Sequence, residues 1–349
     1  MKLMVVCSQG FSPEYFTGSG VYVNGIYKYI PYTKYLKIPA MLVPIKGLYP
    51  FFNLLNHFKT RKCIAKELQH ESSTYEIIHN INVIAFPEIK GPKVVTTVHH
   101  VGLGWRPGIK TRISAPIDFM MEKSMIHNSD YIIAVSDFTK GRILHYFSFP
   151  EERIRVIPNG TDTDVFYPRG LSEERFILFP NALRYPYRKG TYFILPILKK
   201  LMRLYDRACI IIGRLSPEGK RIIDDTSNKF RYAGFVDTED LAKLYSQAMY
   251  VIFPSLYEGF GLILAEVMAS GGAIVSSDVG SVAEYCRSGI NGFVLPHNRE
   301  KWLEVMKELI ENPDLRENIR KNNRQEKARS WKDCAMEHVN FFKYIVENG

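Results

Sequence analysis

The sequence lacks long apolar runs. No stretch of about 18 consecutive apolar residues, the length that crosses a bilayer as a helix, occurs in the 349 residues. The opening MKLMVVCSQGF has too short an apolar run for a signal peptide and is typical of a first strand. We therefore expect a chain that has neither a transmembrane helix nor a secretion signal.

Cysteine is also scarce. The five cysteines are odd in number and scattered, and no two of them have the spacing of metal ligands. This favours a reduced, cytoplasmic protein. The sequence contains neither the phosphate-binding GK[ST] pattern nor GxSxG, so kinase and serine-hydrolase functions are poorly supported.

Positive charge, in contrast, is in excess. The formal net charge of +10 favours anionic partners such as nucleotides, phospholipid surfaces or nucleic acid. A nucleic-acid-binding protein would show a recognition motif or a dense basic stripe, and the sequence shows neither. The hydrophobic content of 46% and the charged content of 23% are those of a folded protein long enough for two domains.

Short apolar runs rich in β-branched residues alternate with helical stretches along the chain. Such runs are typical of a parallel sheet that helices cover on both faces. Two sets follow one another, which predicts an α/β protein with two doubly wound, Rossmann-like domains. The first set is LMVV, AMLVPI, YEIIHN, KVVTTVHH and YIIAVS, and the second is RFILFP, ACIIIG, FRYAG, YVIFPS, GAIVSS and GFVLP.

The predicted domain boundary lies in the segment RIRVIPNGTDTDVFYP, where prolines and Asn159-Gly160 indicate a linker. We assign residues 1–163 to the first domain and residues 164–331 to the second. The final amphipathic segment, about 332–349, is expected to dock back on the first domain. Two open sheets that face each other create a cleft at the carboxyl ends of their strands, where α/β domains bind ligands.

The loop TGSG, after the first predicted strand, is rich in glycine. Gly18 and Gly20 flank Ser19 just before a predicted helix. Because glycine has no side chain, backbone N–H groups there can approach a phosphate at the helix N-terminus. The loop lacks the full dinucleotide-binding fingerprint, so a flexible turn is the alternative.

The segment NALRYPYRKG also lies between a predicted strand and a predicted helix, and it is rich in cations. Arg184 and Lys189 lie five residues apart, and Arg188 precedes the lysine. Cations at the end of a strand can neutralise a diphosphate, and arginine does so with two parallel hydrogen bonds. The alternative is a solvated basic loop.

Two carboxylates in the segment EGFGLILAE need an explanation. Glu266 lies in a predicted helix that is otherwise almost entirely apolar, so it requires a partner in the fold or in a ligand. Glu258 precedes the helix, and both could accept hydrogen bonds from one elongated ligand, one from a sugar and one from a ribose. The N–H groups of Phe260, Gly261 and Leu262 would be free to meet phosphate or hydroxyl oxygens. The alternative makes Glu258 a helix-start acid and Glu266 the partner of a structural cation.

Two histidines, His99 and His100, close the predicted strand KVVTTVHH. A histidine at the carboxyl end of a strand can donate a proton to a substrate hydroxyl or to a leaving group. The alternative is a structural histidine. No further His, Cys or Asp set at ligand spacing accompanies it, so we expect no metal site.

The segment GLYPFFNLLNHFKTRK of the first domain combines aromatic residues with Lys59, Arg61 and Lys62. This composition suits a peripheral contact with an anionic membrane, such as the inner face of the cell membrane. The alternative is a helix with one face in the core and a solvated basic end.

These pieces occur together and in one order. The chain closely resembles the retaining glycosyltransferases of family 4, which have the B-type fold of two Rossmann-like domains. The resemblance runs over nearly the whole chain and is densest between Arg184 and Pro296. Glu258 and Glu266 match the glutamate pair of that family, which has seven residues between its members. The other matching pieces are Gly18-Ser19-Gly20, His99, DYIIAVS, VIPNGTD, Arg184 with Lys189-Gly190, YAGFV and PSLYEGFGLILAEVMASGGAIVSSDVGSVAEYCRSGINGFVLP.

The resemblance implies a role for each matching residue. Glu258 would contact the donor sugar, and Glu266 the ribose hydroxyls of the nucleotide. Arg184 and Lys189 would hold the diphosphate in the place that a metal ion takes in other enzymes. His99 would lie near the sugar and the bond that breaks. The remaining donor contacts would come from Ser19, Gly20, Phe260, Gly261 and Leu262, and the base would lie beside Phe235 and Val236.

The implied reaction moves a hexosyl-type unit from a nucleoside diphosphate to an acceptor hydroxyl, with retention of the anomeric configuration and without a metal or other cofactor. The acceptor is a lipid, a glycan or a small molecule, and the sequence does not fix an oligomeric state. The chain departs from the family pattern at Leu183, where glycine is common, and it resembles the family weakly between residues 30 and 90. Alternatives are a DNA-directed sugar transferase or DNA-binding protein, a non-catalytic nucleotide-sugar-binding member, and a sugar phosphorylase or epimerase on the same fold.

Overall fold

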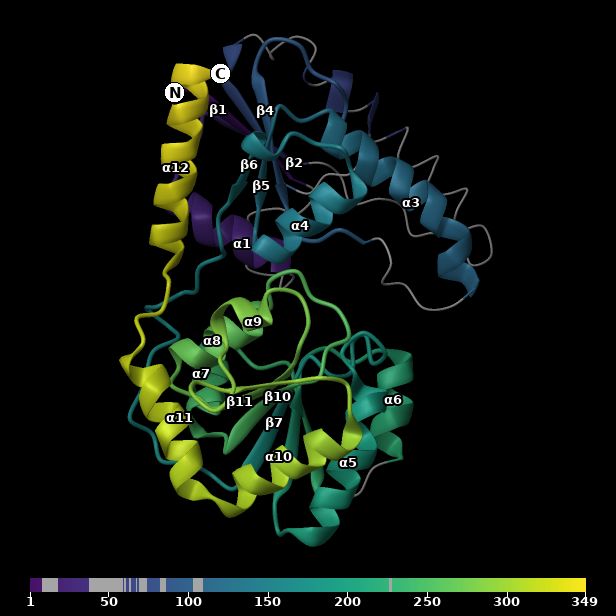
Figure 1. Cartoon of the computed structure of the whole chain (residues 1–349), viewed down its shortest axis with the longest axis vertical. Helices are drawn as coiled ribbons and strands as arrows, with labels where there is room; N and C mark the ends of the chain where they lie inside the picture. The colour runs from purple at the N-terminus through teal and green to yellow at the C-terminus, as the bar shows by residue number, and fades with distance from the viewer. Residues whose placement is uncertain are drawn as a thin grey trace. The chain divides into compact units, whose positions relative to one another are not determined.

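The computed structural model describes residues 1–7, 18–37, 74–81, 86–102, 109–225 and 228–349, and single positions between 59 and 68. The chain divides into two compact units (Figure 1). The first comprises Met1–Gly160 and Trp331–Gly349, and the second comprises Thr161–Ser330. The sequence-based boundaries were residues 163 and 331; the structure has them at Gly160 and Ser330.

The first unit contains a six-stranded sheet in which neighbouring strands run parallel. The strand order is β2-β1-β3-β4-β5-β6. Strands β1 and β3 are buried along their whole length, which explains why their sequences are largely apolar. The strands are β1 (Leu3–Cys7), β2 (Lys34–Lys37), β3 (Ile77–Ile81), β4 (Lys93–Val98), β5 (Tyr131–Ala134) and β6 (Ile154–Val156).

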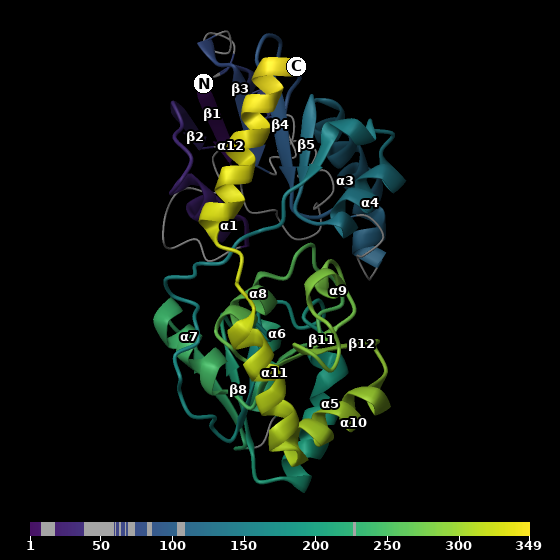
Figure 2. The ribbon, with the colours of Figure 1, turned by 60° about the vertical axis from the view of Figure 1, so that its left-hand side comes forward.

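Helices cover both faces of this sheet (Figures 1 and 2). Adjacent residues of β4 point to opposite faces: Thr97 contacts α1, whereas Val98 packs with residues of α3 and α4. The helices are α1 (Gly18–Tyr27), α3 (Ile109–His127), α4 (Asp137–Tyr146) and α12 (Trp331–Asn348), with a short 3-10 turn at Glu151–Arg153.

The C-terminal helix α12 belongs to the first unit and lies next to α1 (Figure 2). Gly25 of α1 leaves room for the indole ring of Trp331, because a Cβ atom there would lie 2.3 Å from that ring. The predicted return of the final segment to the first domain is therefore confirmed.

A continuous chain of buried hydrogen bonds joins α12 to the sheet. His338 Nδ1 lies 2.8 Å from a backbone carbonyl one turn earlier, so this nitrogen carries the proton and Nε2 accepts. Tyr22 donates to that Nε2 over 2.6 Å and accepts from Thr97 Oγ1 at 3.0 Å. Thr97 accepts from His79 Nε2 at 2.7 Å, which leaves His79 Nδ1 to accept from the hydroxyl of Tyr27. Burial, followed by the nearby His338, holds the pKa of His79 well below its usual value, so His79 is uncharged at neutral pH.

The second unit contains another six-stranded parallel sheet, with the strand order β12-β11-β10-β7-β8-β9. Its strands are β7 (Phe176–Pro180), β8 (Ala208–Ile212), β9 (Phe230–Gly234), β10 (Tyr250–Phe253), β11 (Ile274–Ser277) and β12 (Phe293–Leu295). Its helices are α5 (Thr191–Leu204), α6 (Pro217–Asp224), α7 (Thr238–Gln247), α8 (Leu262–Ala269), α9 (Val282–Tyr285), α10 (Arg299–Glu311) and α11 (Pro313–Gln325). The prediction of two doubly wound α/β domains is confirmed.

The strand order of the second sheet reverses between β7 and β10. The chain runs outward from β7 to β8 and β9, and then returns to form β10 on the other side of β7. The helices that follow β7 and β10, α5 and α8, therefore pack on opposite faces of the sheet. Open α/β sheets bind their ligands at the carboxyl ends of the strands next to such a reversal.

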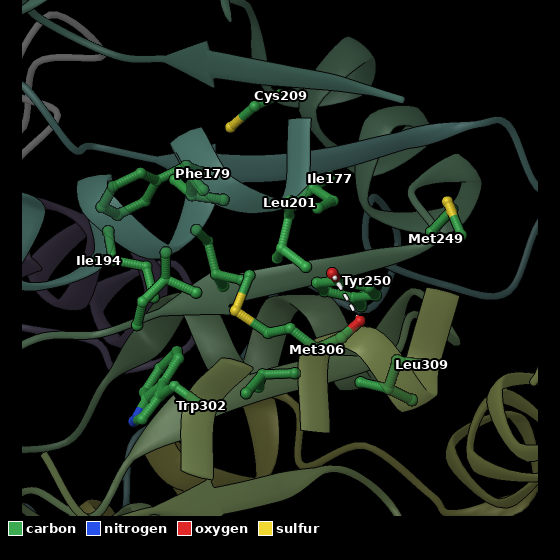
Figure 3. Packing of buried hydrophobic residues seen from close by; sticks show 14 of the residues in the cluster. Ile177, Phe179, Ile194, Leu201, Cys209, Met249, Tyr250, Trp302, Met306 and Leu309 are labelled. Atoms are coloured by element: carbon green, nitrogen blue, oxygen red, sulfur yellow. Dashed lines mark hydrogen bonds between the residues drawn. The ribbon is translucent and has the colours of Figure 1, made fainter. Parts of the chain in front are cut away.

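The core of the second unit fixes these strands against α5 and α10 (Figure 3). Ile177 of β7, Leu201 of α5 and Trp302 of α10 are fully buried. The hydroxyl of Tyr250 donates to the carbonyl of Met306 over 3.2 Å, which satisfies the only polar group of that side chain. Each such apolar side chain contributes about 1.5–3 kcal/mol through burial. The loops at the carboxyl ends of these strands therefore start from positions that the core holds in place.

Buried arginines attach α11 to the same unit. Arg316 holds the Glu173 carboxylate with two forked contacts and also donates to the last carbonyls of α10. Arg320 donates to the carbonyls of Ala248 and Ser246 at the end of α7. Both guanidinium groups thus satisfy helix-end carbonyls that have no partner within their own helix.

The second set of predicted strands is found in full. In the first set, four runs contain β1, β3, β4 and β5, and the run AMLVPI lies outside the described residues. Strands β2 and β6 were not predicted. Both lie at edges of the first sheet and are only partly buried, so their sequences lack an apolar run.

Three further expectations concern composition. The four described cysteines, Cys7, Cys209, Cys286 and Cys334, are buried thiols. No helix in the described part of the chain is long and apolar enough to cross a membrane. The aromatic residues of the predicted membrane contact lie outside the described residues, whereas Lys59 and Lys62 are exposed, so that contact stays a prediction.

Candidate active site

The loop after β7 and the loop after β10 are pressed together at the carboxyl edge of the second sheet. Gly190 has φ +67°, and a Cβ atom there would lie 1.8 Å from the carbonyl oxygen of Pro254. The carbonyl of Arg188 accepts a hydrogen bond from the N–H of Leu256 over 2.8 Å. Only glycine fits at position 190, because a side chain would force the two loops apart.

Lys189 and Glu258, one from each of these loops, form a buried ion pair. Lys189 Nζ lies 2.7 Å from Glu258 Oε1, and the two side chains are only 10% and 14% exposed. Burial alone would raise the pKa of Glu258, but Lys189 and then Arg188 hold it below its usual value. Burial lowers the pKa of Lys189, and the Glu258 charge opposes this. Glu258 is therefore a carboxylate at neutral pH.

Two arginines of the same loop have no carboxylate partner among the described residues. The guanidinium carbons of Arg184 and Arg188 lie 5.2 and 5.4 Å from the ring centre of Tyr185. Neither arginine makes an ion pair with any described residue. Glu258 offsets the charge of Lys189, so the net positive charge of this loop comes from Arg184 and Arg188, whereas Lys189 keeps N–H donors beyond the one that binds Glu258.

Among the described residues, no side chain caps the backbone N–H groups at the start of α8. Gly261 has φ +85° and precedes the helix, with no side chain capping its first N–H groups. The first amides of a helix have no acceptor within the helix, and they attract anions. Helix α8 begins at Leu262, so Glu258 lies in the loop and is not a helix-start acid.

Glu266 lies in the second turn of α8 and is half-buried. Its Oε2 accepts a hydrogen bond from the hydroxyl of Tyr245 over 3.3 Å, and it forms no ion pair with a described residue. The alternative of a structural cation partner is therefore wrong for the described part of the chain. Burial raises the pKa of Glu266 to about 8, so its carboxyl carries a proton at neutral pH in most molecules.

Phe235 and Val236 follow directly after β9, on the same edge of the sheet. The Phe235 ring is 52% exposed, so an aromatic face is accessible at this edge. Val236 is half-buried against the apolar residues beneath α7. The two residues thus offer a flat apolar surface at the end of this strand.

The remaining predicted residues belong to the first unit. Ser19 and Gly20 lie in the first turn of α1 rather than in a loop before it. His99 follows β4, and its ring lies 4.6 Å from the ring of Tyr22, at an interplanar angle of 85°. Burial, followed by the charges of His100 and His338, lowers the pKa of His99 to about 3. His99 is therefore neutral, and its Nε2 has no hydrogen-bond partner in the described part of the chain.

Two sequence profiles match the chain. The profile of the "Glycosyltransferase Family 4" matches residues 17–165, and that of the "Glycosyl transferases group 1" matches residues 167–326. The chain belongs to the family 4/group 1 glycosyltransferases. An uncharacterized glycosyltransferase of Methanocaldococcus jannaschii is 28% identical over 276 residues, which are 72% of this chain and 70% of that one.

Solved structures show the glycosyltransferase fold as well. Sucrose-phosphate synthase of Thermosynechococcus elongatus superposes with a TM-score of 0.82 at 18% identity, over 100% of both chains. HepE of Anabaena, solved in complex with UDP and glucose, has a TM-score of 0.73 at 15% identity and covers 98% of this chain and 99% of its own. The fold is the B-type fold of two Rossmann-like domains, as the resemblance implied.

The structure of this glycosyltransferase brings part of the predicted site together. Glu258 and Lys189 are in contact, and Arg184 lies on the same loop as Lys189. Glu266 and Phe235 lie on the same sheet edge, whereas Ser19, Gly20 and His99 belong to the first unit. Three residues that support this site were not indicated by the sequence. Tyr245 donates to Glu266, and Ser281 and Tyr285 donate to the carbonyl of Phe260. Tyrosine and serine in short helices resemble ordinary core and cap residues, so no local pattern could have identified them.

No three His, Cys, Asp or Glu side chains gather as a potential metal site in the described ranges. A reaction without a metal ion stays a prediction. The cations that could replace a metal are those of the loop after β7.

Proposed function

We propose that this glycosyltransferase is a retaining hexosyltransferase, which moves a sugar from a nucleoside diphosphate to an acceptor hydroxyl. The observation that carries the proposal is the buried pair of Lys189 and Glu258, 2.7 Å apart at the point where the strand order reverses, with Arg184 on the same loop. A nucleotide sugar needs a cationic site for its diphosphate and acceptors for its hydroxyls. The complex of HepE with UDP and glucose supports this donor class.

Each group has a role in the proposed complex. Arg184, Lys189 and the amides of Gly261 and Leu262 bind the diphosphate, while Glu258 accepts hydrogen bonds from hydroxyls of the sugar. Glu266 accepts hydrogen bonds from the ribose hydroxyls. Phe260 also offers its amide, and Phe235 and Val236 flank the base. Ser19, Gly20 and His99 are the remaining proposed donor contacts.

The proposed reaction breaks the bond between the anomeric carbon and the phosphate oxygen, and the bonding electrons leave with the diphosphate. The acceptor oxygen bonds to the same face of the sugar, and its proton passes to the departing phosphate. Because the acceptor attacks the same face, retention needs no second displacement by a carboxylate. Glu258, held by Lys189, then serves as a hydrogen-bond acceptor for the sugar. Fixed cations and amides that face the growing negative charge lower the barrier, each by about 2.7–4 kcal/mol.

The acceptor and the location remain part of the proposal. The acceptor is a lipid, a glycan or a small molecule, and the reaction takes place in the cytoplasm. The basic segment around Lys59 and Lys62 would bring the enzyme to an anionic membrane surface. Sedimentation with anionic liposomes at two salt concentrations tests that contact.

A screen of UDP-, GDP-, ADP- and dTDP-sugars by thermal shift tests the donor. One base is expected to raise the melting temperature, because a ligand that binds only the folded state stabilises it. Proton NMR of the product then gives the anomeric configuration, which is expected to match that of the donor. Inversion, or the absence of any stabilising donor, would contradict the proposal. Binding without turnover on any acceptor would favour a non-catalytic member, and retention of DNA in a gel shift would favour a DNA-directed enzyme.

Donor affinity is expected to increase with pH up to about 8. In the empty protein, burial raises the pKa of Glu266 from its usual value of 4.5 to about 8. The Glu266 carboxyl therefore carries a proton between these two pH values, where a solvated glutamate would be ionised. In the proposed complex, two ribose hydroxyls donate hydrogen bonds to Glu266, and the ionised carboxylate is the form that accepts both. Binding of the donor therefore releases the proton of Glu266. Affinity should therefore fall by up to about tenfold for each pH unit below 8. Calorimetry with an intact nucleotide sugar, whose diphosphate does not titrate in this range, measures the effect.

The matched control for this pH dependence is Glu266→Gln. The variant should bind the donor weakly and equally between pH 6 and 9, because an amide has no proton to release. A wild-type affinity that does not change with pH would remove Glu266 from the ribose contact.

A further inference from the structure

The loop that carries the donor-binding amides is held from behind by two side chains. Ser281 Oγ donates to the carbonyl of Phe260 over 2.9 Å. The hydroxyl of Tyr285 lies 2.7 Å from the same carbonyl and 3.1 Å from that of Gly261. The Tyr285 ring also stacks on the Phe260 ring, with centroids 5.3 Å apart and an interplanar angle of 26°.

Both side chains come from the segment between β11 and the end of α9, which packs closely on the loop. Gly280 has φ +62°, and a Cβ atom there would lie 2.3 Å from the carbonyl oxygen of Glu258. A Cβ atom on Gly261 would lie 3.1 Å from the Tyr285 hydroxyl. The glycines at positions 261 and 280 therefore allow a close backbone approach that the side chains of Ser281 and Tyr285 then fix.

The orientation of these carbonyls determines where the amides point. In a trans peptide the C=O of one residue and the N–H of the next point in opposite directions. The carbonyls of Phe260 and Gly261 face α9, so the N–H groups of Gly261 and Leu262 face away from it. These are two of the amides that start α8 without a side-chain cap. The N–H of Leu264 also donates to the Gly261 carbonyl, over 2.9 Å, so Tyr285 acts together with the helix start to set the direction of both donors.

We propose that Tyr285, assisted by Ser281, is a positioning residue that aims the Gly261 and Leu262 amides at the diphosphate of the nucleotide donor. The inference rests on the proposed function, because it names the diphosphate as the group that these amides receive. Tyr285 does not touch the substrate. It prevents the loop peptides from rotating, so that the amides are already oriented when negative charge builds up on the departing phosphate.

Tyr285→Phe tests this role. The ring and its stacking on Phe260 remain, and only the hydroxyl that holds the two carbonyls is lost. We expect kcat to fall by about 10- to 100-fold, and the affinity for UDP to fall more than the affinity for UMP, since the missing orientation concerns the diphosphate. GDP and GMP take their place if the donor screen selects guanosine.

The matched control is Tyr250→Phe. Tyr250 lies in the core of the same unit, and its hydroxyl also donates to a backbone carbonyl, that of Met306. This variant suffers the same chemical change and should lose similar stability, yet it should retain the kcat and the preference for diphosphate over monophosphate of the wild type. Ser281→Ala should act in the same direction as Tyr285→Phe, with a smaller effect.

The outcomes separate this inference from the proposed function. If the wild-type protein binds no nucleoside diphosphate, the proposed function fails and the inference fails with it. If the wild type binds UDP or GDP, and Tyr285→Phe retains both kcat and the ratio of diphosphate to monophosphate affinity, the donor site stands and the positioning role of Tyr285 is disproved. An equal loss in Tyr285→Phe and Tyr250→Phe would also disprove it, because that result reflects stability alone.

Discussion

A Glu258→Gln protein is expected to fold and to lose transfer activity by about 100- to 1,000-fold. The glutamine has nearly the same shape, and its amide oxygen can still accept a hydrogen bond from Lys189, whose Nζ lies 2.7 Å from the carboxylate in the wild type. It has no negative charge, however, so it accepts hydrogen bonds from sugar hydroxyls less strongly in the transition state. The measurement is kcat and KM for the donor identified by thermal shift, together with the melting temperature.

Glu173→Gln provides the matched control for this experiment. Glu173 also belongs to the second unit and forms a partly buried ion pair, but its partner is the structural Arg316. This variant should lose stability and retain its turnover. A Glu258→Gln enzyme with a kcat close to that of the wild type would show that the reacting sugar does not contact Glu258, and the assigned site would be wrong.

Lys189→Met is expected to reverse the pH dependence of stability that Glu258 contributes. In the wild type, Lys189 and Arg188 hold the pKa of Glu258 below 4.5, so the pair stabilises the fold above that pH and the contribution is lost as pH falls. In the variant, Arg188 remains but the larger effect of Lys189 is gone, so we expect burial to raise the pKa of Glu258 above its usual value. The folded protein then loses stability as the pH increases.

The size of this effect at neutral pH follows from the burial of the pair. Removal of one member of a buried ion pair typically costs about 3–5 kcal/mol, because the other charge remains without a partner. Lys189 also contributes to diphosphate binding, so UDP or GDP affinity should fall by about 10- to 100-fold, which corresponds to one charged hydrogen bond. Urea unfolding between pH 5 and pH 8 and calorimetry with the diphosphate measure the two effects.

The double variant Lys189→Met/Glu258→Gln separates stability from binding. Without either charge, the pair leaves no buried ion, so most of the lost stability should return while the diphosphate affinity stays low. A single Lys189→Met variant as stable as the wild type at pH 8 would contradict the buried ion pair. A full recovery of affinity in the double variant would contradict the phosphate-binding role of Lys189.

The second unit could be predicted strand by strand from the sequence, and the first could not. Strands β7 and β10 are buried throughout, and a strand covered on both faces needs an unbroken apolar run. Strands β2 and β6 lie at sheet edges, where polar side chains can remain in water. Their sequences, KYLK and IRV, therefore lack the apolar run that identifies a buried strand. Local sequence therefore reports burial rather than strand pairing.

The candidate site was predictable in its residue types and less so in its geometry. The unusual carboxylates Glu258 and Glu266 and the basic loop stand out in the sequence. Their partners do not: the contact of Lys189 with Glu258 joins residues 69 positions apart, and that of Tyr245 with Glu266 joins residues from two helices. The raised pKa of Glu266 likewise follows from burial, which only the folded chain reveals.

The attachment of α12 has a consequence for protein synthesis. His338 supplies the acceptor for Tyr22, a contact that spans 316 positions of the chain. A ribosome must complete the whole of Thr161–Ser330 before this helix emerges. The usual order, in which the N-terminal domain folds first, is therefore reversed for the final step: a chain that ended at Ser330 would contain the whole second unit, while Tyr22 of the first would lack the acceptor that His338 supplies.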